Sequence, residues 1–263
     1  FDEHQFTVVA VSSYGRILSY QWDIYAFLEY YGQLPLPPYV EYDPSKESQY
    51  QPIMASLPWS VASPTASLHF TQELLDKLSY KGVWLDYVTL HVGVGTFRSI
   101  DSDEIESYQI HSEHCQIDIS LFKRLTEYAL SDKITIAVWT TSCRTLESLP
   151  YLYHLAKSDI VWHLSDSERL FWDKISSDIA SQQYINNYHI VWQSIIFDCQ
   201  LYITPWFSFR IIDQLITNFH LPKSSLMVLV ASFMWYDMMM QCYYDAIQKN
   251  YMFYSFGDAM WIQ

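Results

Sequence analysis

Glycine is scarce in this chain, which has only six glycines among 263 residues. So few glycines are kept where the backbone geometry demands them, in turns, after helices and in close approaches. Gly93 and Gly95 allow a loop backbone to approach a ligand, but Arg98 stands where a dinucleotide-binding fingerprint has its third glycine. The glycine pair alone is therefore weak evidence for nucleotide binding.

Closely spaced cysteine pairs are also missing, because Cys115, Cys143, Cys199 and Cys242 are far apart in the sequence. A chain of this size needs no disulfides to fold, and such spacing is typical of reduced thiols. The first residues, Phe1-Asp2-Glu3-His4, are acidic where a secretory signal would be basic and then apolar. Both observations predict a cytoplasmic protein.

Long apolar runs and an excess of positive charge are absent too. The longest apolar segment, 226–244, is interrupted by Ser232, Asp237 and Gln241, which favours a buried helix over a membrane span. The chain has 15 basic and 29 acidic residues, for a net charge of -14. This charge argues against broad electrostatic binding of nucleic acid or anionic membrane, so any contact with RNA has to be local.

The remaining composition is that of a globular α/β protein. Half of the residues, 50%, are hydrophobic, which is enough to fill a core. Two short strands are expected within 8–20, and a Pro-rich joint with a polar run, 41–51, suggests a domain boundary near Leu34. Beyond it the patterns predict helices at 72–80, 120–130, 211–216 and 224–248, and strands at 83–90, 134–138 and near 201–203. The segment 149–200 is expected to be a partly helical insertion.

Polar residues gather in four segments between apolar runs, at 64–71, 89–98, 110–113 and 215–222. These segments fall on loops at the ends of expected elements, and we interpret them as parts of one pocket. In open α/β sheets ligands bind beyond the carboxyl ends of strands, which favours His91, directly after the expected strand 83–90.

Several motifs occur in a characteristic order: Pro35-Leu36-Pro37-Pro38-Tyr39, Val61-Ala62-Ser63-Pro64-Thr65-Ala66-Ser67-Leu68-His69-Phe70-Thr71, Val88-Thr89-Leu90-His91-Val92-Gly93-Val94-Gly95-Thr96-Phe97-Arg98, His111-Ser112-Glu113, Thr140-Thr141-Ser142-Cys143-Arg144-Thr145-Leu146-Glu147-Ser148, Thr217-Asn218-Phe219-His220-Leu221-Pro222-Lys223-Ser224 and Ser255-Phe256-Gly257-Asp258-Ala259. In these motifs the chain resembles the S-adenosylmethionine:tRNA ribosyltransferase-isomerase family of queuosine biosynthesis. The resemblance covers roughly 34–148 and 201 to the end, with an enlarged middle between them.

The resemblance implies a fold, a reaction and partners. The fold would be a mixed-sheet α/β domain with helices on both faces at 35–263, carrying an insertion at about 149–200, and preceded at 1–34 by the tail of a small β-barrel whose front part is missing. The reaction would move the ribosyl part of S-adenosylmethionine to 7-aminomethyl-7-deazaguanine in tRNA, giving epoxyqueuosine and releasing adenine and methionine. The expected partners are the tRNA anticodon stem-loop and S-adenosylmethionine as ribosyl donor, with no metal, no membrane and a monomeric protein.

Such a reaction needs a base beside the sulfonium, an acid for the leaving adenine, and groups that hold hydroxyls and a carboxylate. For acid–base work we select His91, His111 and Glu113. The remaining polar residues of the motifs are candidates for substrate binding, because their side chains form hydrogen bonds and the two arginines can hold anions. They are Thr65, His69, Thr96, Arg98, Thr141, Arg144, Asn218, His220 and Asp258.

Plainer interpretations stay open. His69 and His220 taken singly suit hydrogen-bonded structural positions, and Arg144 with Glu147 suits a helical ion pair. His111, His114 and Cys115 are of the types that bind zinc, which would indicate a zinc-dependent hydrolase.

An inactive or redesigned homologue that serves as a binding or structural module is the other alternative. Trp59, Trp139 and Trp235 stand where the family motifs usually have glycine, and such bulk either fills a ligand's space or shifts the backbone.

Overall fold

The computed structural model describes residues 5–12, 15–37, 39–41, 43–57, 60–93, 100, 104–177, 179 and 184–263. The chain divides into two compact units, Phe1–Pro35 and Leu36–Gln263. None of the four cysteines forms a disulfide, and Cys115, Cys143 and Cys199 are buried.

The first unit is an antiparallel hairpin followed by a short helix. Strand β1 (Thr7–Ser12) pairs with β2 (Gly15–Ser19), and α1 is Ile24–Tyr31. Asp23 caps the helix by accepting hydrogen bonds from the backbone of its first turn. The hairpin confirms the two expected strands, whereas the origin of this unit in a β-barrel stays a prediction.

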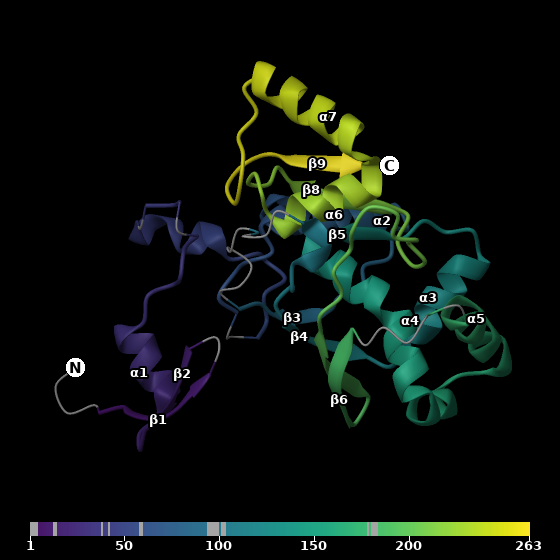
Figure 1. Cartoon of the computed structure of the whole chain (residues 1–263), viewed down its shortest axis with the longest axis horizontal. Coiled ribbons are helices and arrows are strands. Elements are labelled where there is room, and N and C mark those ends of the chain that lie inside the picture. The colour runs from purple at the N-terminus through teal and green to yellow at the C-terminus, as the bar shows by residue number, and fades with distance from the viewer. Residues whose placement is uncertain are drawn as a thin grey trace. The chain divides into compact units, whose positions relative to one another are not determined.

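The second unit is mixed α/β, which confirms the predicted fold class (Figure 1). Its α-helices are α2 (Gln72–Tyr80), α3 (Ser120–Leu130), α4 (Thr140–Ile160), α5 (Asp166–Ser176), α6 (Ser225–Met234) and α7 (Tyr236–Gln248). Its strands are β3 (Thr89–His91), β4 (Glu113–Asp118), β5 (Ile136–Val138), β6 (Ile185–Val191), β7 (Ser194–Cys199), β8 (Gln214–Asn218) and β9 (Ala259–Ile262). Short 3-10 helices are η1 (Pro44–Lys46), η2 (Ser48–Tyr50), η3 (Thr65–His69), η5 (Ile105–Ser107) and η6 (Val161–His163).

Two sheets organise this unit. One is antiparallel in the order β3-β4-β7-β6, and the other is mixed in the order β5-β8-β9. In the mixed sheet β5 runs parallel to β8, with Ala137 opposite Leu215, while β9 runs antiparallel to β8. The carboxyl ends of β5 and β8 therefore meet at one edge.

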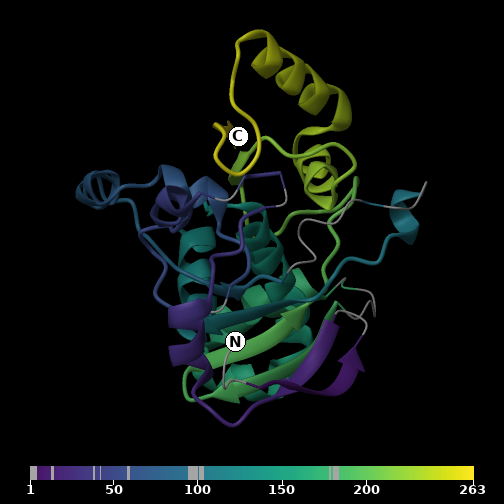
Figure 2. The ribbon, with the colours of Figure 1, turned by 90° about the vertical axis from the view of Figure 1, so that its left-hand side faces the viewer.

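Helix α4 links the two sheets, because it contacts β5 and β8 of one and β6 and β7 of the other. Figure 2 shows strands of the antiparallel sheet in front of the helices that cover it. Helices α3 and α5 complete the layer, and Trp172 of α5 is fully buried with its indole N–H donating to the carbonyl of Phe122. The central helix thus fixes the mixed sheet relative to the antiparallel one.

Glu147 of α4 anchors the segment that leads into β8. Its carboxylate is buried and accepts hydrogen bonds from the backbone N–H groups of Arg210 at 2.8 Å, Ile211 at 2.9 Å and Ile212 at 2.9 Å. Burial raises the pKa of this carboxyl above its ordinary value, although the three hydrogen bonds act to lower it. The alternative interpretation of Arg144 with Glu147 as a helical ion pair is wrong, since Arg144 pairs with Glu113 instead.

The structure corrects several expected elements. The segment 211–216 was predicted as a helix, but β8 begins at Gln214, and its alternating burial beside parallel β5 outweighs the helical pattern. Pairing in the expected strand 83–90 is confined to Thr89–His91, and the strand expected near 201–203 lies earlier, at Ser194–Cys199. The single helix expected over 224–248 breaks at Trp235.

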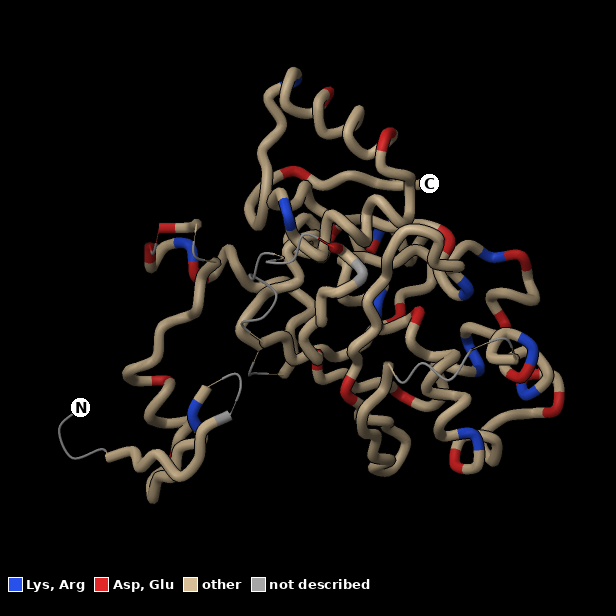
Figure 3. The backbone as a smooth tube through the Cα atoms, in the orientation of Figure 1, with Lys and Arg blue, Asp and Glu red and all other residues tan. Residues whose placement is uncertain are grey.

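Within the described residues, no single helix has the length and apolar composition to cross a membrane; α6 and α7 meet that test only together, and they bend by 111° at their break. Figure 3 shows basic and acidic residues interspersed around α3 and α5.

Replacing Glu147 tests the anchoring role. Glu147→Ala leaves three backbone N–H groups without their acceptor, and we expect the free energy of unfolding to fall by about 3 kcal/mol or more. Glu147→Gln keeps an acceptor oxygen and should lose less. Urea unfolding measures both variants, and a loss below about 1 kcal/mol for Glu147→Ala contradicts the role.

Candidate functional site

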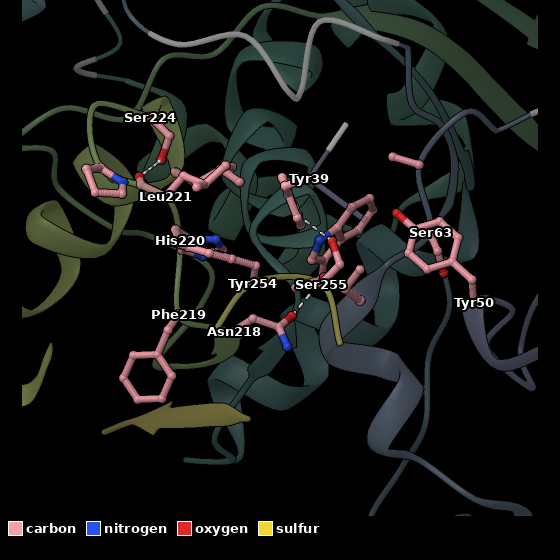
Figure 4. A pocket seen from close by; sticks show the side chains of 15 residues that line it. Tyr39, Tyr50, Ser63, Asn218, Phe219, His220, Leu221, Ser224, Tyr254 and Ser255 are labelled. Carbon is pink, nitrogen blue, oxygen red and sulfur yellow. Dashed lines mark hydrogen bonds between the residues drawn. The ribbon is translucent and has the colours of Figure 1, made fainter. Parts of the chain in front are cut away.

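A pocket lies where the parallel strands β5 and β8 end (Figure 4). Trp139, directly after β5, and Asn218, the last residue of β8, both line it. The cavity has a volume of about 60 Å³. Carboxyl ends of parallel strands are the usual position of ligand sites in α/β sheets.

A hydrogen-bond network joins three of the predicted site residues at this pocket. The Thr65 hydroxyl donates to Asn218 Oδ1 at 2.8 Å, and Asn218 Nδ2 donates to the carbonyl of Gly257 at 3.2 Å. His69 Nε2 lies 3.0 Å from the same carbonyl. A side chain at position 257 would meet backbone atoms of Phe253 at 2.4 Å, so only glycine fits there. Three motifs far apart in the sequence thus meet at one backbone carbonyl.

His220 also lines the pocket, and it is held as a neutral ring. Its Nε2 lies 2.8 Å from the Thr217 hydroxyl, and its backbone N–H donates to the Tyr243 hydroxyl at 2.9 Å. Burial lowers the pKa of this imidazole from 6.5 to about 3. At neutral pH the ring therefore acts as an uncharged hydrogen-bonding group.

Two buried hydroxyls in the pocket are left without a partner among the described residues, those of Tyr50 and Ser63. Tyr50 is 1% exposed, and burial raises the pKa of its phenol to about 12, although the Ser63 backbone and the Ser255 side chain lie near enough to oppose that shift. Buried polar groups are nearly always hydrogen-bonded. Unpaired hydroxyls in a pocket are thus available for a bound polar molecule.

Aromatic rings form another side of the pocket. The Tyr39 and Tyr254 rings are 5.2 Å apart at their centroids, and the Tyr39 hydroxyl lies 2.6 Å from the Ser255 hydroxyl, as the dashed line in Figure 4 shows. Burial raises the pKa of Tyr39, so its phenol stays neutral. A flat, partly polar ligand suits such a wall because stacking and hydrogen bonding act on it together.

A second polar cluster lies further along α4. Arg144 Nη1 donates to Glu113 Oε2 at 2.9 Å, and Arg144 Nε donates to the carbonyl of Leu201 at 3.0 Å. His111 Nε2 lies 3.3 Å from Glu113 Oε1. Arg144 and Glu113 are 3% and 2% exposed, so this is a buried ion pair. Burial is the largest single cause and acts to lower the pKa of Arg144, but Glu113 together with Cys199, Cys115 and Cys143 makes the net shift upward. The carboxylate thus joins a charged guanidinium to an imidazole.

His91 belongs to a different group, on the antiparallel sheet. It pairs in register with His114, their ring centroids are 6.0 Å apart, and His114 Nδ1 lies 2.9 Å from Asp198 Oδ1. His114 is exposed, whereas its strand neighbour Cys115 is fully buried. Successive residues of a strand point to opposite faces, so the His111-His114-Cys115 zinc arrangement does not form. The described residues contain no group of three or more metal-binding side chains.

The other predicted residues have separate positions. Thr141 is buried in the first turn of α4, where its carbonyl accepts from the Thr145 hydroxyl. Asp258 Oδ2 accepts from the backbone N–H of Met252, which ties the turn before β9. Thr96, Arg98 and Trp59 lie outside the described residues.

The sequence analysis assigned no binding role to Tyr39, Tyr50, Ser63, Tyr254 or Ser255. All five line the pocket. Tyr39, Ser63 and Ser255 stand inside the ordered motifs, so the sequence carries a signal for these three. Tyrosine is common throughout the chain, which has 22, and the sequence does not separate the tyrosines of the pocket from the others.

Comparison with known proteins agrees with this architecture. A family model described as "Queuosine biosynthesis protein" matches residues 2–262. The S-adenosylmethionine:tRNA ribosyltransferase-isomerases of Halothermothrix orenii and Herminiimonas arsenicoxydans are similar at 36% and 38% identity, over 94% and 93% of this chain and 63% and 62% of their own length. The chain thus spans less than two thirds of the length of these relatives.

A solved structure is also similar. The crystal structure of S-adenosylmethionine tRNA ribosyltransferase from Thermotoga maritima matches with a TM-score of 0.50 and 32% identity, over 75% of this chain and 51% of that one. Fold, ordered motifs and family match define a protein of the queuosine-biosynthesis class. The chain belongs to the queuosine biosynthesis protein family.

The buried His220 predicts a specific dependence of stability on pH. Its pKa in the folded chain, about 3, lies below the ordinary 6.5, so between these values only the unfolded chain binds the proton and stability falls as the pH falls. By pH 4.5 this amounts to about 2 to 3 kcal/mol. His220→Gln should therefore show a shallower loss of stability between pH 6.5 and pH 4.5 in urea unfolding.

The exposed His163 supplies the control for this slope. The stability curve of His163→Gln should run parallel to that of the unchanged protein. If His220→Gln also runs parallel, the buried neutral state of His220 is wrong.

Proposed function

We propose that this protein transfers and isomerises the ribosyl moiety of S-adenosylmethionine onto 7-aminomethyl-7-deazaguanine in tRNA, giving epoxyqueuosine and releasing adenine and methionine. The proposal is supported by family membership and by relatives that are named S-adenosylmethionine:tRNA ribosyltransferase-isomerase. The observation that carries it is the pocket at the ends of β5 and β8, with its unpaired hydroxyls and tyrosine wall.

In this proposal the pocket holds the nucleoside part of S-adenosylmethionine. The adenine ring stacks against Tyr39 and Tyr254, because the flat face of any base can stack on an aromatic ring. The ribose hydroxyls and the amino group bind Tyr50, Ser63 and the Thr65–Asn218 pair. Neutral His220 adds a hydrogen bond without placing a second positive charge beside the sulfonium.

His111 and Glu113 are the acid–base candidates that the geometry favours. The Glu113 carboxylate lies beside the His111 ring and orients it, and Arg144 Nη1 donates to the other oxygen of that carboxylate. An imidazole with an orienting carboxylate suits proton removal beside a sulfonium or protonation of departing adenine. His91, with His114 and Asp198 behind it, remains the second candidate.

The proposed partners follow from the same activity. The tRNA substrate is expected to present its anticodon stem-loop to a local surface, because the net charge of -14 opposes extended contact with the backbone phosphates. We further propose that the protein is monomeric and cytoplasmic, and that it uses S-adenosylmethionine as a substrate without a metal.

The test uses protein purified from the cells that naturally make it. Calorimetry should detect binding of S-adenosylmethionine, and incubation with tRNA carrying the precursor base should release adenine. Binding without release supports the alternative of an inactive homologue with a binding role. Absence of both contradicts the proposed function.

Replacing the two histidines in the same cells separates chemistry from binding. We expect His111→Ala to lower the rate of adenine release by about 10²- to 10⁴-fold, the usual contribution of an acid–base group. Its affinity for S-adenosylmethionine should stay within about threefold, since rate loss with retained affinity marks a transition-state role.

His91→Ala is the comparison, and His154→Ala, with an exposed side chain outside both clusters, is the control. A rate loss in His91→Ala but not in His111→Ala transfers the role to His91. Unchanged rates in both variants contradict the assignment of acid–base chemistry to these histidines.

A further inference from the structure

The tryptophans of this chain fall into two groups by backbone conformation. Trp139, Trp192, Trp206 and Trp235 have positive φ angles of 82°, 59°, 76° and 66°. Only a few per cent of non-glycine residues have positive φ, mostly Asn and Asp, and a bulky residue there is a genuine outlier. Four such residues among the tryptophans that the structure describes, which are all but Trp59 of the ten in the chain, is far above that frequency.

Trp139 and Trp235 have the most restrictive conformation. Their φ and ψ angles are 82° and 146° for Trp139 and 66° and 145° for Trp235, and each residue immediately precedes a helix. This is not the left-handed helical region that Asn and Asp visit. Positive φ combined with ψ near 150° is essentially confined to glycine.

Trp192 occupies a glycine position in a hairpin. It is the first of the two residues that join β6 and β7, where Val191 pairs with Ser194. Its φ is positive, whereas Gln193 is not among the described residues with positive φ. That is the pattern of a type II′ turn, which has glycine at its first central position.

Trp206 occupies a glycine position in a different turn. The N–H of Phe207 donates to the carbonyl of Thr204 at 3.1 Å, so these residues close a β-turn with Pro205 and Trp206 at its centre. Proline followed by a residue with positive φ is the signature of a type II turn, and the second central residue is then glycine or asparagine.

Side-chain contacts vary within both groups, since Trp206 and Trp235 pack edge to face with centroids 4.9 Å apart, and Trp162, without a positive φ, is 82% exposed. Trp172 and Trp261 donate indole hydrogen bonds to Phe122 and Gln214, and Trp84 lies 3.7 Å below the Lys133 ammonium. By contrast, the indoles of the tryptophans with positive φ donate no hydrogen bond to another described residue. The indoles of Trp192 and Trp206 are 92% and 82% exposed.

We propose that positions 139, 192, 206 and 235 carry glycine in the protein as its own cells make it, through a codon that is read as tryptophan in the printed sequence. UGA is such a codon, because some translation systems read it as tryptophan and others as glycine. Glycine at these four positions raises the count above the six of the printed sequence, which is a change toward the roughly 7% of ordinary proteins and accounts for part of the scarcity. Tryptophans with ordinary backbones, such as Trp172, come from the standard tryptophan codon.

Position 139 connects this inference to the site, and this step rests on the proposed function. Trp139 is 4% exposed, lines the pocket and packs against Ala62, Ala66 and Val92. The cavity volume of about 60 Å³ is far below the roughly 300 Å³ that is the lower end of the range for small-molecule sites. Glycine at 139 removes the indole from the wall and gives the nucleoside room beside Asn218.

Mass spectrometry of peptides from the native protein tests the residue identities directly. We expect glycine at 139, 192, 206 and 235, and tryptophan at Trp172 and Trp261. The gene should carry UGA at the first four positions and UGG at the other two. Tryptophan at the first four positions in the native peptides overturns the inference, whatever the binding data show.

Recombinant variants test the effect on the pocket. Trp139→Gly should bind S-adenosylmethionine at least about tenfold more tightly than the chain with Trp139, as measured by calorimetry. Trp192→Gly is the matched control, because its indole is exposed and outside the pocket. Its melting temperature should rise by about 2 to 4 °C, with unchanged affinity.

The outcomes separate the two proposals. Glycine in the native peptides together with no binding by folded Trp139→Gly supports the residue assignment and contradicts the nucleoside pocket. If Trp139→Gly fails to fold, the affinity for S-adenosylmethionine is measured on the native protein, which has glycine at 139, in place of the variant. If the chain with Trp139 and Trp139→Gly bind S-adenosylmethionine with equal affinity, the idea that the indole of Trp139 narrows the pocket is wrong.

Discussion

The parallel pairing of β5 with β8 is the constraint on which the rest of the site depends. It places the first turn of α4 beside the Thr217-Asn218-Phe219-His220 segment, although more than 70 residues separate them in the chain. Helix α4 then carries Arg144 to the Glu113–His111 cluster and Glu147 to the backbone before β8. One strand pair and one helix thus organise the pocket and the buried ion pair.

Charges inside this unit are stabilised by specific partners. A buried ion pair is favourable only when hydrogen bonds satisfy the groups taken out of water, and Arg144 meets this condition through Glu113 and the Leu201 carbonyl. Glu147 meets it with three backbone N–H groups. His220 avoids the cost by staying neutral. The site therefore holds a fixed charge near α4 and an uncharged, hydrogen-bonding pocket at the strand ends.

The sequence predicted the family and the α/β class, and it placed the segments of Thr65 and Asn218 in one expected pocket. It failed where long-range contacts override local preference. The segment before Thr217 has a helical pattern, but pairing with β5 makes it a strand. The four polar segments were expected in one pocket, yet strand alternation separates His91 and His114 from the Glu113 cluster. The tryptophans at glycine positions were visible in part from the motifs, and the backbone angles of Trp192 and Trp206 revealed the others.

The most direct measurement of the central claim is a crystal structure of the native protein with S-adenosylmethionine. The account predicts the adenine against Tyr39 and Tyr254, the ribose beside the Thr65–Asn218 pair, and glycine at position 139 facing the nucleoside. Density for the nucleoside against His91 and His114, with an indole filling position 139, would contradict it.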